Sequence, residues 1–367
     1  MKNNFRHQTY SADQPAALYE LLNPEFPAQP EIDAFGAIAK QFGERIGGKI
    51  QTIYLVHGSF VGDDALGWTA QISKLFPGVG SQITTIGKRL VDLISGESGN
   101  FTEEFRSLLE NSICRQQQNV AVKQFVWSSE NTHTGRARAA IELLHELLES
   151  GQSKFLFLCH SHGGNVLALL TNLLGAGASE REQFLEIMRP LFVGEGEAVF
   201  TNVWHFLQTK TNDEFEINVV TMGTPVRYGW EPARVRCLLH FVNHCPEDGC
   251  AEYLSPLPRP TLDALKSMKG DLIQQIGIAS TNFLPFLFDR QLLNVEKSMG
   301  QLIQAGIERS DIIERLKIGM RVHDTGKTLL VNYDNHANLA KRMAGHAIYT
   351  RPEWLAFHLN EIGRRIF

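Results

Sequence analysis

Hydrophobic positions along this chain follow two alternating patterns. Short runs rich in β-branched and aromatic residues, typical of buried strands, are separated by longer stretches in which apolar residues recur at helical spacing. Strands that alternate with helices usually join into a parallel sheet. The pattern therefore predicts an α/β fold with a mostly parallel central sheet and helices on both faces. The predicted strands cover residues 51–56, 120–127, 154–160, 217–223, 237–244 and 327–333.

The intervening stretches predict helices. The clearest runs from about Thr134 to Ser150, where apolar residues recur at helical spacing after a Thr and Gly opening. A second begins at Gly164, where NVLALLTNLL is apolar enough to be a buried helix. Further helical patterns cover residues 34–45, 68–94 and 102–114.

The chain is expected to form one elaborated domain. Residues 1–48 are punctuated by prolines and carry no evident chemistry, so we interpret them as an N-terminal extension of a domain spanning 49–367. Helical material exceeds the needs of the sheet in three places, which are candidates for a cap or lid. These predicted insertions lie at about 68–115, 175–216 and 254–325.

Composition and charge narrow the function classes. The net charge of −5 comes from 35 basic and 40 acidic residues without a basic stripe, which disfavours nucleic acid as a partner. No segment approaches the roughly 20 apolar residues of a transmembrane helix, and the first residues lack a signal-peptide core. Five cysteines, an odd number, disfavour a disulfide framework. We expect a cytoplasmic protein without integral membrane association; signal-less secretion stays compatible, and the oligomeric state stays undetermined.

A serine between a predicted strand and a predicted helix is the leading candidate for chemistry. In FLFLCHSHGGNVL, Ser161 directly follows the strand at 154–160, and Gly163 stands two residues later. A tight strand-to-helix turn exposes such a hydroxyl and needs small residues on both sides. Cys159 occupies the position that is glycine in G-x-S-x-G. The alternative is an ordinary turn in which Ser161 caps the helix.

CHSHGGNVL, taken with LVHGSF at residues 55–60, resembles the lipase-like branch of the α/β-hydrolase superfamily. Residues 127–144 and VVTMGTP at 219–225 are similar to the units on either side of the nucleophile in that family. The resemblance covers roughly residues 50–250 and the last forty. It implies a serine, acid and histidine in that chain order, an acyl-enzyme intermediate, and no metal or organic cofactor.

The resemblance also implies an oxyanion hole made of backbone amides. One amide is that of His162, after the nucleophile, and the other comes from Ser59, with Phe60 as the alternative. We interpret His57 as a side chain that ties down the loop carbonyls. Adjacent acids at 63–64 are interpreted as solvated loop residues rather than metal ligands.

The base and the acid should follow the last two predicted strands. His346 comes after Gly345 and shortly before a helix-forming segment, similar to the GH-x-x-Y arrangement of related hydrolases; His336 is the alternative base. The acid is expected in NHCPEDGCAEY, beyond the strand at 237–244. Asp248 is preferred because the family favours aspartate and glycine follows it, and Glu247 is its competitor.

The substrate is the least determined feature. Residues 276–288 are apolar enough to line an acyl pocket or form a lid, although their phenylalanines are more typical of a core. The hypothesis is hydrolysis of a small-molecule or lipid ester. The alternatives are a catalytically silent binding module, or a thioesterase, amidase or acyltransferase with the same triad. His240, His244, Cys245 and Cys250 lie close in sequence, but their spacing matches no familiar zinc site.

Overall fold

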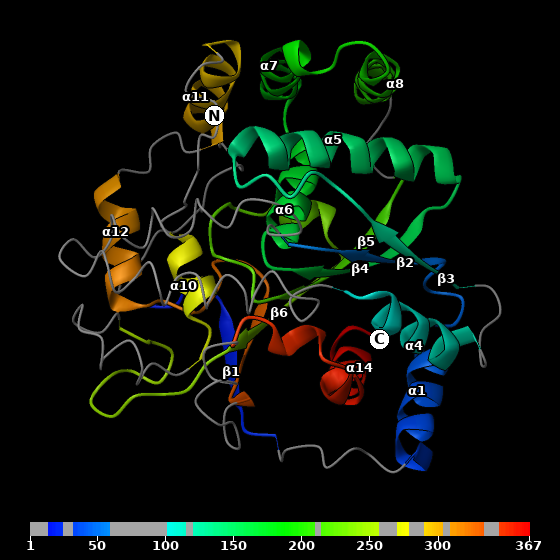
Figure 1. Ribbon diagram of the computed structural model, residues 1–367, viewed down its shortest axis with the longest axis vertical. Helices are drawn as coiled ribbons and strands as arrows, with labels where there is room; N and C mark the ends of the chain where they lie inside the picture. The colour runs from blue at the N-terminus through cyan, green and yellow to red at the C-terminus, as the bar shows by residue number, and fades with distance from the viewer. Residues whose placement is uncertain are drawn as a thin grey trace.

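A seven-stranded, all-parallel sheet forms the centre of the molecule, with helices packed around it (Figure 1). The strand order is β1-β7-β6-β5-β4-β2-β3. This computed structural model describes residues 14–24, 32–58, 101–114, 120–209, 214–256, 270–278, 290–303, 309–333 and 345–367. The predicted α/β fold is confirmed. The strands are β1 (Leu18–Leu22), β2 (Thr52–Val56), β3 (Ala121–Phe125), β4 (Lys154–His160), β5 (Glu216–Met222), β6 (Cys237–Asn243) and β7 (Lys327–Val331).

Strand β4 lies in the interior of the sheet, between β5 and β2, and its sequence explains that position. KFLFLCH is apolar on both faces because helices cover both faces of a parallel sheet, and every residue after Lys154 is buried. The strand pairs with β2 through Val56 and Cys159, and with β5 through His160 and Met222. The carboxyl ends of β2, β4 and β5 therefore lie side by side at one end of the sheet, where the segments that follow them come close together.

Two helical layers cover the sheet. Helices α5 and α6 lie on one face, and α1, α4 and α14 lie on the other (Figure 1). Helix α5 begins where the Thr132 side chain accepts a hydrogen bond from the Gly135 amide, and Gly151 ends it in the left-handed conformation. The helices are α1 (Ile32–Ile46), α4 (Glu103–Cys114), α5 (His133–Ser150), α6 (His162–Gly175), α7 (Ala178–Met188), α8 (Gly196–Thr209), α10 (Leu272–Ile278), α11 (Arg290–Ile303), α12 (Arg309–Ile318) and α14 (Pro352–Ile366), with short 3₁₀ turns η2 (Arg189–Leu191), η3 (Pro232–Arg234) and η5 (Ile348–Thr350).

Helices occur in the described parts of the ranges interpreted as insertions. Helices α7 and α8 lie within residues 175–216, and α10, α11 and α12 lie within 254–325. The helical pattern at 68–94, and most of the apolar segment at 276–288, fall outside the described residues. Within the described part of the chain, no helix combines the length and the apolar character that a bilayer crossing requires.

The segment interpreted as an N-terminal extension contributes to the sheet. Strand β1 adds to the sheet edge by pairing with β7, and α1 packs against α14. Strand β1 carries a weak local signal, because LYELL has neither a continuous apolar run nor a clean alternation. Its residues are exposed or half-buried, as an edge strand allows.

An ion-pair cluster attaches β1 to the rest of the molecule. Glu20 on β1 accepts hydrogen bonds from Arg365 at 2.7 and 2.8 Å and from Lys327 at 2.7 Å. These bonds from Arg365 and Lys327 lower the pKa of Glu20 to about 2. A carboxyl whose pKa is depressed by folding stabilises the native state above its unfolded pKa, and that contribution is lost as the pH falls through the folded pKa.

We therefore expect Glu20→Gln to lower the free energy of unfolding at pH 7 by about 1 kcal/mol or less, because the cluster is partly solvated. The difference from wild type should shrink between pH 4.5 and about 2. Denaturant unfolding of the variant and the wild type, at pH 7 and again near the lower end of that pH range, measures the difference in the free energy of unfolding. Glu142→Gln, which removes the simple helix-surface pair of Glu142 with Arg138, is the control and should cost less. An equal difference at both pH values would contradict the role of Glu20.

Candidate active site

Ser161 lies at the sharp turn between β4 and α6 and has a strained backbone. Its φ of 51° and ψ of −131° lie outside the regions that non-glycine residues favour. The turn is held on both sides, because the Ser161 amide donates to the Met222 carbonyl at 2.9 Å and Thr224 Oγ1 donates to the Ser161 carbonyl at 2.7 Å. The Ser161 side chain makes no capping hydrogen bond to α6. The alternative of a capping serine therefore finds no support.

Small residues surround Ser161 because other backbone segments pass close by. A Cβ at Gly163 would lie 2.5 Å from the Val56 carbonyl oxygen, and one at Gly58 would lie 2.6 Å from the Ser161 Cβ. Cys159 is buried in the core on the sheet side of the turn. Burial raises the pKa of the Cys159 thiol well above its usual range, so cysteine serves here as a small neutral side chain.

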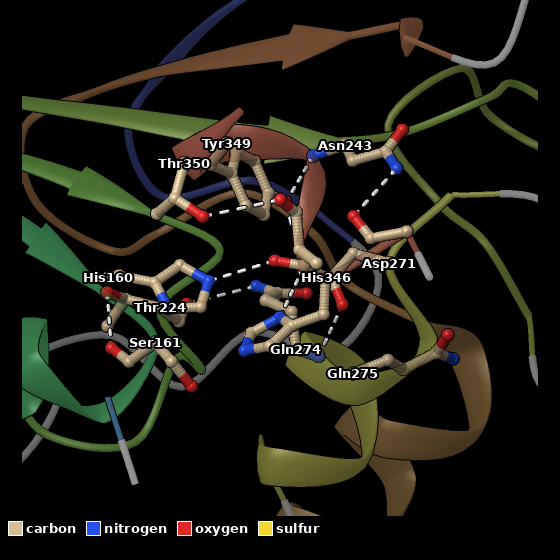
Figure 2. Close-up of polar contacts among 12 residues, drawn as sticks. His160, Ser161, Thr224, Asn243, Asp271, Gln274, Gln275, His346, Tyr349 and Thr350 are labelled. Carbon is tan, nitrogen blue, oxygen red and sulfur yellow. Dashed lines mark hydrogen bonds and ion pairs between the residues drawn. The ribbon is translucent and has the colours of Figure 1, made fainter. Parts of the chain in front are cut away.

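His346 follows β7 and lies just before η5 and α14. Its Nδ1 contacts Asp271 Oδ2 at 2.8 Å, which places the Nδ1 proton in that bond and leaves Nε2 as an acceptor. Among the described residues, neither His346 Nε2 nor Ser161 Oγ has a hydrogen-bond partner, and both atoms are buried. Figure 2 shows the His346 ring between Asp271 and Ser161. The alternative base, His336, lies outside the described residues.

Asp271 is fully buried and accepts three hydrogen bonds. Its Oδ2 accepts from His346 Nδ1 and from the Tyr349 hydroxyl, each at 2.8 Å, and its Oδ1 accepts from the Gln274 amide at 2.9 Å. Burial by itself would raise the pKa of Asp271, but the charge of His346 and these hydrogen bonds together lower it. Asp271 is therefore ionised near neutral pH.

The two predicted acids, Asp248 and Glu247, do not lie against His346 in the structure. Asp248 and Glu247 are both exposed in the turn after β6, whereas the carboxylate that contacts His346 is Asp271. A carboxylate that orients a buried imidazole must itself be removed from water, because solvent would screen the interaction. The exposed turn cannot supply this environment.

Asp271 nevertheless lies at the carboxyl end of β6, the strand after which the acid was expected. Its amide donates to the Asn243 carbonyl at 2.9 Å, although residues 244–270 separate the two positions in sequence. Gly270 permits this approach, since its φ is +77° and a Cβ there would lie 2.8 Å from the Asn243 oxygen. A signal for this turn is present in the sequence. Gly270 and Asp271 stand directly before α10, and the Asp271 side chain caps that helix by accepting from the Gln274 backbone N–H.

The loop after β2 is held close to Ser161 by His57. Trp127 donates its amide to His57 Nε2 at 3.1 Å, so the proton of His57 is on Nδ1, which donates to the Gly58 carbonyl at 2.8 Å. Burial lowers the pKa of His57, which keeps its ring neutral. The ring also stacks on Trp127, with centroids 5.7 Å apart. Ser59 and Phe60, the predicted oxyanion residues of this loop, lie outside the described residues.

His162 is the first residue of α6, where a backbone amide has no acceptor within the helix. Its side chain contacts Asn165 Nδ2 at 3.1 Å through Nδ1, which must therefore be the acceptor. Burial, and next the positive charge of Arg136, lower the pKa of His162 well below its usual value. The side chain is neutral, and the chemical contribution available from His162 is its amide.

His160 contacts the segment that carries His346. Its Nε2 donates to the His346 carbonyl oxygen at 2.8 Å, and the two rings lie 4.6 Å apart. Burial, followed by the charge of His346, lowers the pKa of His160 to about 3, so it is a neutral donor. Asn243 Nδ2 donates to the Gly345 carbonyl at 3.1 Å on the other side of His346. The sequence analysis assigned neither contact.

The histidines and cysteines near β6 do not gather into a metal site. His240 contacts Thr221 Oγ1 at 2.6 Å within the sheet, and His244 contacts the Glu252 carbonyl at 2.7 Å. Among the residues that the structure describes, no three His, Cys, Asp or Glu side chains are placed to hold a metal ion.

The site thus brings together Ser161 after β4, Asp271 after β6 and His346 after β7. These strands lie in the order β7-β6-β5-β4 and are parallel, so all three side chains lie at the carboxyl ends of neighbouring strands. Comparison of the chain with protein-family models, with curated proteins and with solved structures finds no match.

Proposed function

We propose that this protein is a serine hydrolase that cleaves carboxylic esters through an acyl-enzyme intermediate. The observation that carries the proposal is the alignment of Asp271, His346 and Ser161. His346 Nδ1 is bound to a buried carboxylate, while His346 Nε2 and Ser161 Oγ are both buried without a partner among the described residues. Two unsatisfied groups of this kind are costly to bury, and they persist most often where function uses them.

The chemistry follows from these protonation states. Ser161 Oγ attacks the ester carbonyl carbon as His346 Nε2 accepts its proton, and Asp271 stabilises the imidazolium that forms. His346 then gives the proton to the leaving alcohol oxygen as the carbon–oxygen bond breaks. Water, deprotonated by His346, hydrolyses the acyl-enzyme and restores the serine.

Backbone donors would stabilise the negative charge on the carbonyl oxygen. The His162 amide is free of intrahelical acceptors and adjoins the nucleophile. Gly58 brings the loop after β2 against Ser161, which supports a second donor from that loop. The assignment of this donor to Ser59 or Phe60 stays a prediction.

The chain order also supports the proposal. A serine on a strained strand-to-helix turn, followed along the chain by an acid and then a histidine, is the arrangement of α/β-hydrolases. Here that order is Ser161, Asp271 and His346. The backbone strain at Ser161 is an independent feature of the same turn type.

Labelling with a fluorophosphonate probe tests the proposal, because the probe reacts with serines activated by a base. We expect one covalent adduct, mapped by peptide mass spectrometry to Ser161, and none in Ser161→Ala. Ser129→Ala is the matched control, since Ser129 is also buried with a positive φ of 61° and should not affect the adduct. A folded protein without any Ser161-dependent adduct would identify a catalytically silent scaffold.

The leaving-group class needs a second experiment. A panel of p-nitrophenyl esters of increasing acyl length, with matched thioesters and amides, compares kcat/KM across the candidate reactions. Faster turnover of esters is expected, and a clear preference for thioesters or amides would replace the ester assignment. A preference for long acyl chains would support the prediction that a lipid ester is the substrate.

A further inference from the structure

We propose that Tyr349 is a positioning residue of this site, whose hydroxyl fixes Asp271 in the orientation that His346 requires. The inference rests on the proposed function for its catalytic meaning. Its structural basis is separate, because it depends on contacts between Tyr349, Asp271 and the end of β6.

The direction of the hydrogen bonds at Tyr349 is determined by chemistry. The backbone N–H of Asn243 contacts the Tyr349 oxygen at 2.7 Å and can only donate. The single hydroxyl proton is therefore free to point to Asp271 Oδ2, which lies 2.8 Å away and, when ionised, can only accept. Figure 2 shows Tyr349 close to both Asn243 and Asp271.

Tyr349 and His346 share one carboxylate oxygen. Asp271 Oδ2 accepts from both, while Oδ1 is bound by the Gln274 amide. Three donors from different directions prevent the carboxylate from rotating about its bond to Cβ. Since η5 carries Tyr349 three residues after His346, the same segment supplies the imidazole and the group that holds its partner.

The end of β5 leaves room for this arrangement. Gly223 has a φ of +63°, and a Cβ there would lie 2.5 Å from Tyr349 Cε2 and 2.7 Å from Asp271 Oδ2. Any side chain at Gly223 would therefore push the tyrosine ring and the carboxylate apart. The ends of β5 and β6 and the Asp271 carboxylate therefore lie together around Tyr349.

The charge on Asp271 depends on the groups that face it. These are His346, Tyr349, His160 and Arg321, whose guanidinium donates to the Asp271 carbonyl at 2.6 Å. Burial, and next the negative charge of Asp271, raise the pKa of Tyr349 well above its usual value, so it stays a donor. Removing its hydroxyl should raise the pKa of Asp271 without changing the formal charge of the site.

Tyr349→Phe tests the inference, with Tyr333→Phe as the matched control. Both tyrosines are buried in the same cluster with rings 5.6 Å apart, but the Tyr333 hydroxyl contacts His358 Nε2 at 2.8 Å instead. Carbon-13 NMR of the aspartate carboxyls gives the pKa of Asp271, and proton NMR detects the Nδ1 proton of His346. Ester hydrolysis gives kcat and KM separately.

We expect Tyr349→Phe to raise the pKa of Asp271, to shift the His346 Nδ1 resonance and to lower kcat by about 10-fold to 100-fold with little change in KM. Tyr333→Phe should leave all three unchanged. An unchanged Asp271 pKa and Nδ1 resonance in a folded Tyr349→Phe variant would overturn the inference.

Two further outcomes separate this inference from the proposed function. If the wild-type protein lacks a Ser161-dependent adduct, the proposed hydrolase fails, while the NMR comparison still decides whether Tyr349 controls Asp271. If Tyr349→Phe does not fold, the Tyr349 hydroxyl proton is followed in the wild type. Its resonance should move as Asp271 titrates, and independence from that titration would overturn the inference.

Discussion

Asparagine in place of Asp271 is expected to lower kcat for ester hydrolysis by about 10³-fold to 10⁴-fold, the size of effect known for the same change in serine proteases. The side chains are nearly equal in volume, so the packing around residue 271 should survive. The carboxamide carries no charge, and its NH₂ group can favour the wrong tautomer of His346. The reaction then loses both the oriented imidazole and the stabilisation of its positive charge. Steady-state kinetics on a p-nitrophenyl ester measures the loss.

Asp248→Asn is the control that distinguishes the two candidate acids. Asp248 is exposed in the turn after β6, so its replacement should change kcat by less than about 2-fold. Glu247→Gln should behave in the same way. If Asp248→Asn lost as much activity as Asp271→Asn, the pairing of His346 with Asp271 would not be the catalytic one.

Gly163→Ala is expected to lower the free energy of unfolding by about 3 kcal/mol or more. It should also abolish ester hydrolysis by the proposed site. The added Cβ would lie 2.5 Å from the Val56 oxygen and 2.6 Å from the His57 oxygen. These are backbone atoms of β2 and its loop, which cannot rotate away as a side chain would. Either α6 or the loop must move, and both hold the nucleophile site together.

The matched control for this prediction is Gly36→Ala in α1. Gly36 is also helical, but a Cβ there meets nothing within 4 Å. Its replacement should stabilise the protein by about 0.5–1 kcal/mol, the usual gain of alanine over glycine in a helix. Denaturant unfolding of the two variants should therefore give changes of opposite sign. A neutral Gly163→Ala would show that the turn tolerates a larger residue.

The histidines near Ser161 differ in the groups that their rings contact. His57, His160 and His162 have their pKa values lowered, in each case chiefly by burial, and each uses a ring nitrogen to hold a neutral neighbour. Of these four residues, His346 alone contacts a carboxylate. Burial outweighs the other contacts of His57, His160 and His162 and keeps their rings neutral, while Asp271 offers His346 a negatively charged partner, as the proposed mechanism requires.

Much of the fold could be predicted from local sequence. The strand KFLFLCH was placed at the bounds of β4, and the other predicted strands agree with β2, β3, β5, β6 and β7 to within a few residues. Continuous apolar runs bounded by polar or glycine residues are strong local signals, because a strand covered on both faces excludes polar side chains. The turn at Ser161 was likewise local, since the residues that make it are consecutive.

Local sequence was enough to predict the parallel α/β architecture and to place Ser161 on its turn, whereas the choice of His346 as the base stays a prediction. Three features became visible only in the folded chain: Asp271 rather than Asp248 contacts His346, β1 joins the sheet edge, and Tyr349 and His160 contact Asp271 and the His346 segment. The physical reason is burial. A carboxylate becomes the partner of an imidazole through desolvation and converging donors, and these arise only when the ends of distant strands meet.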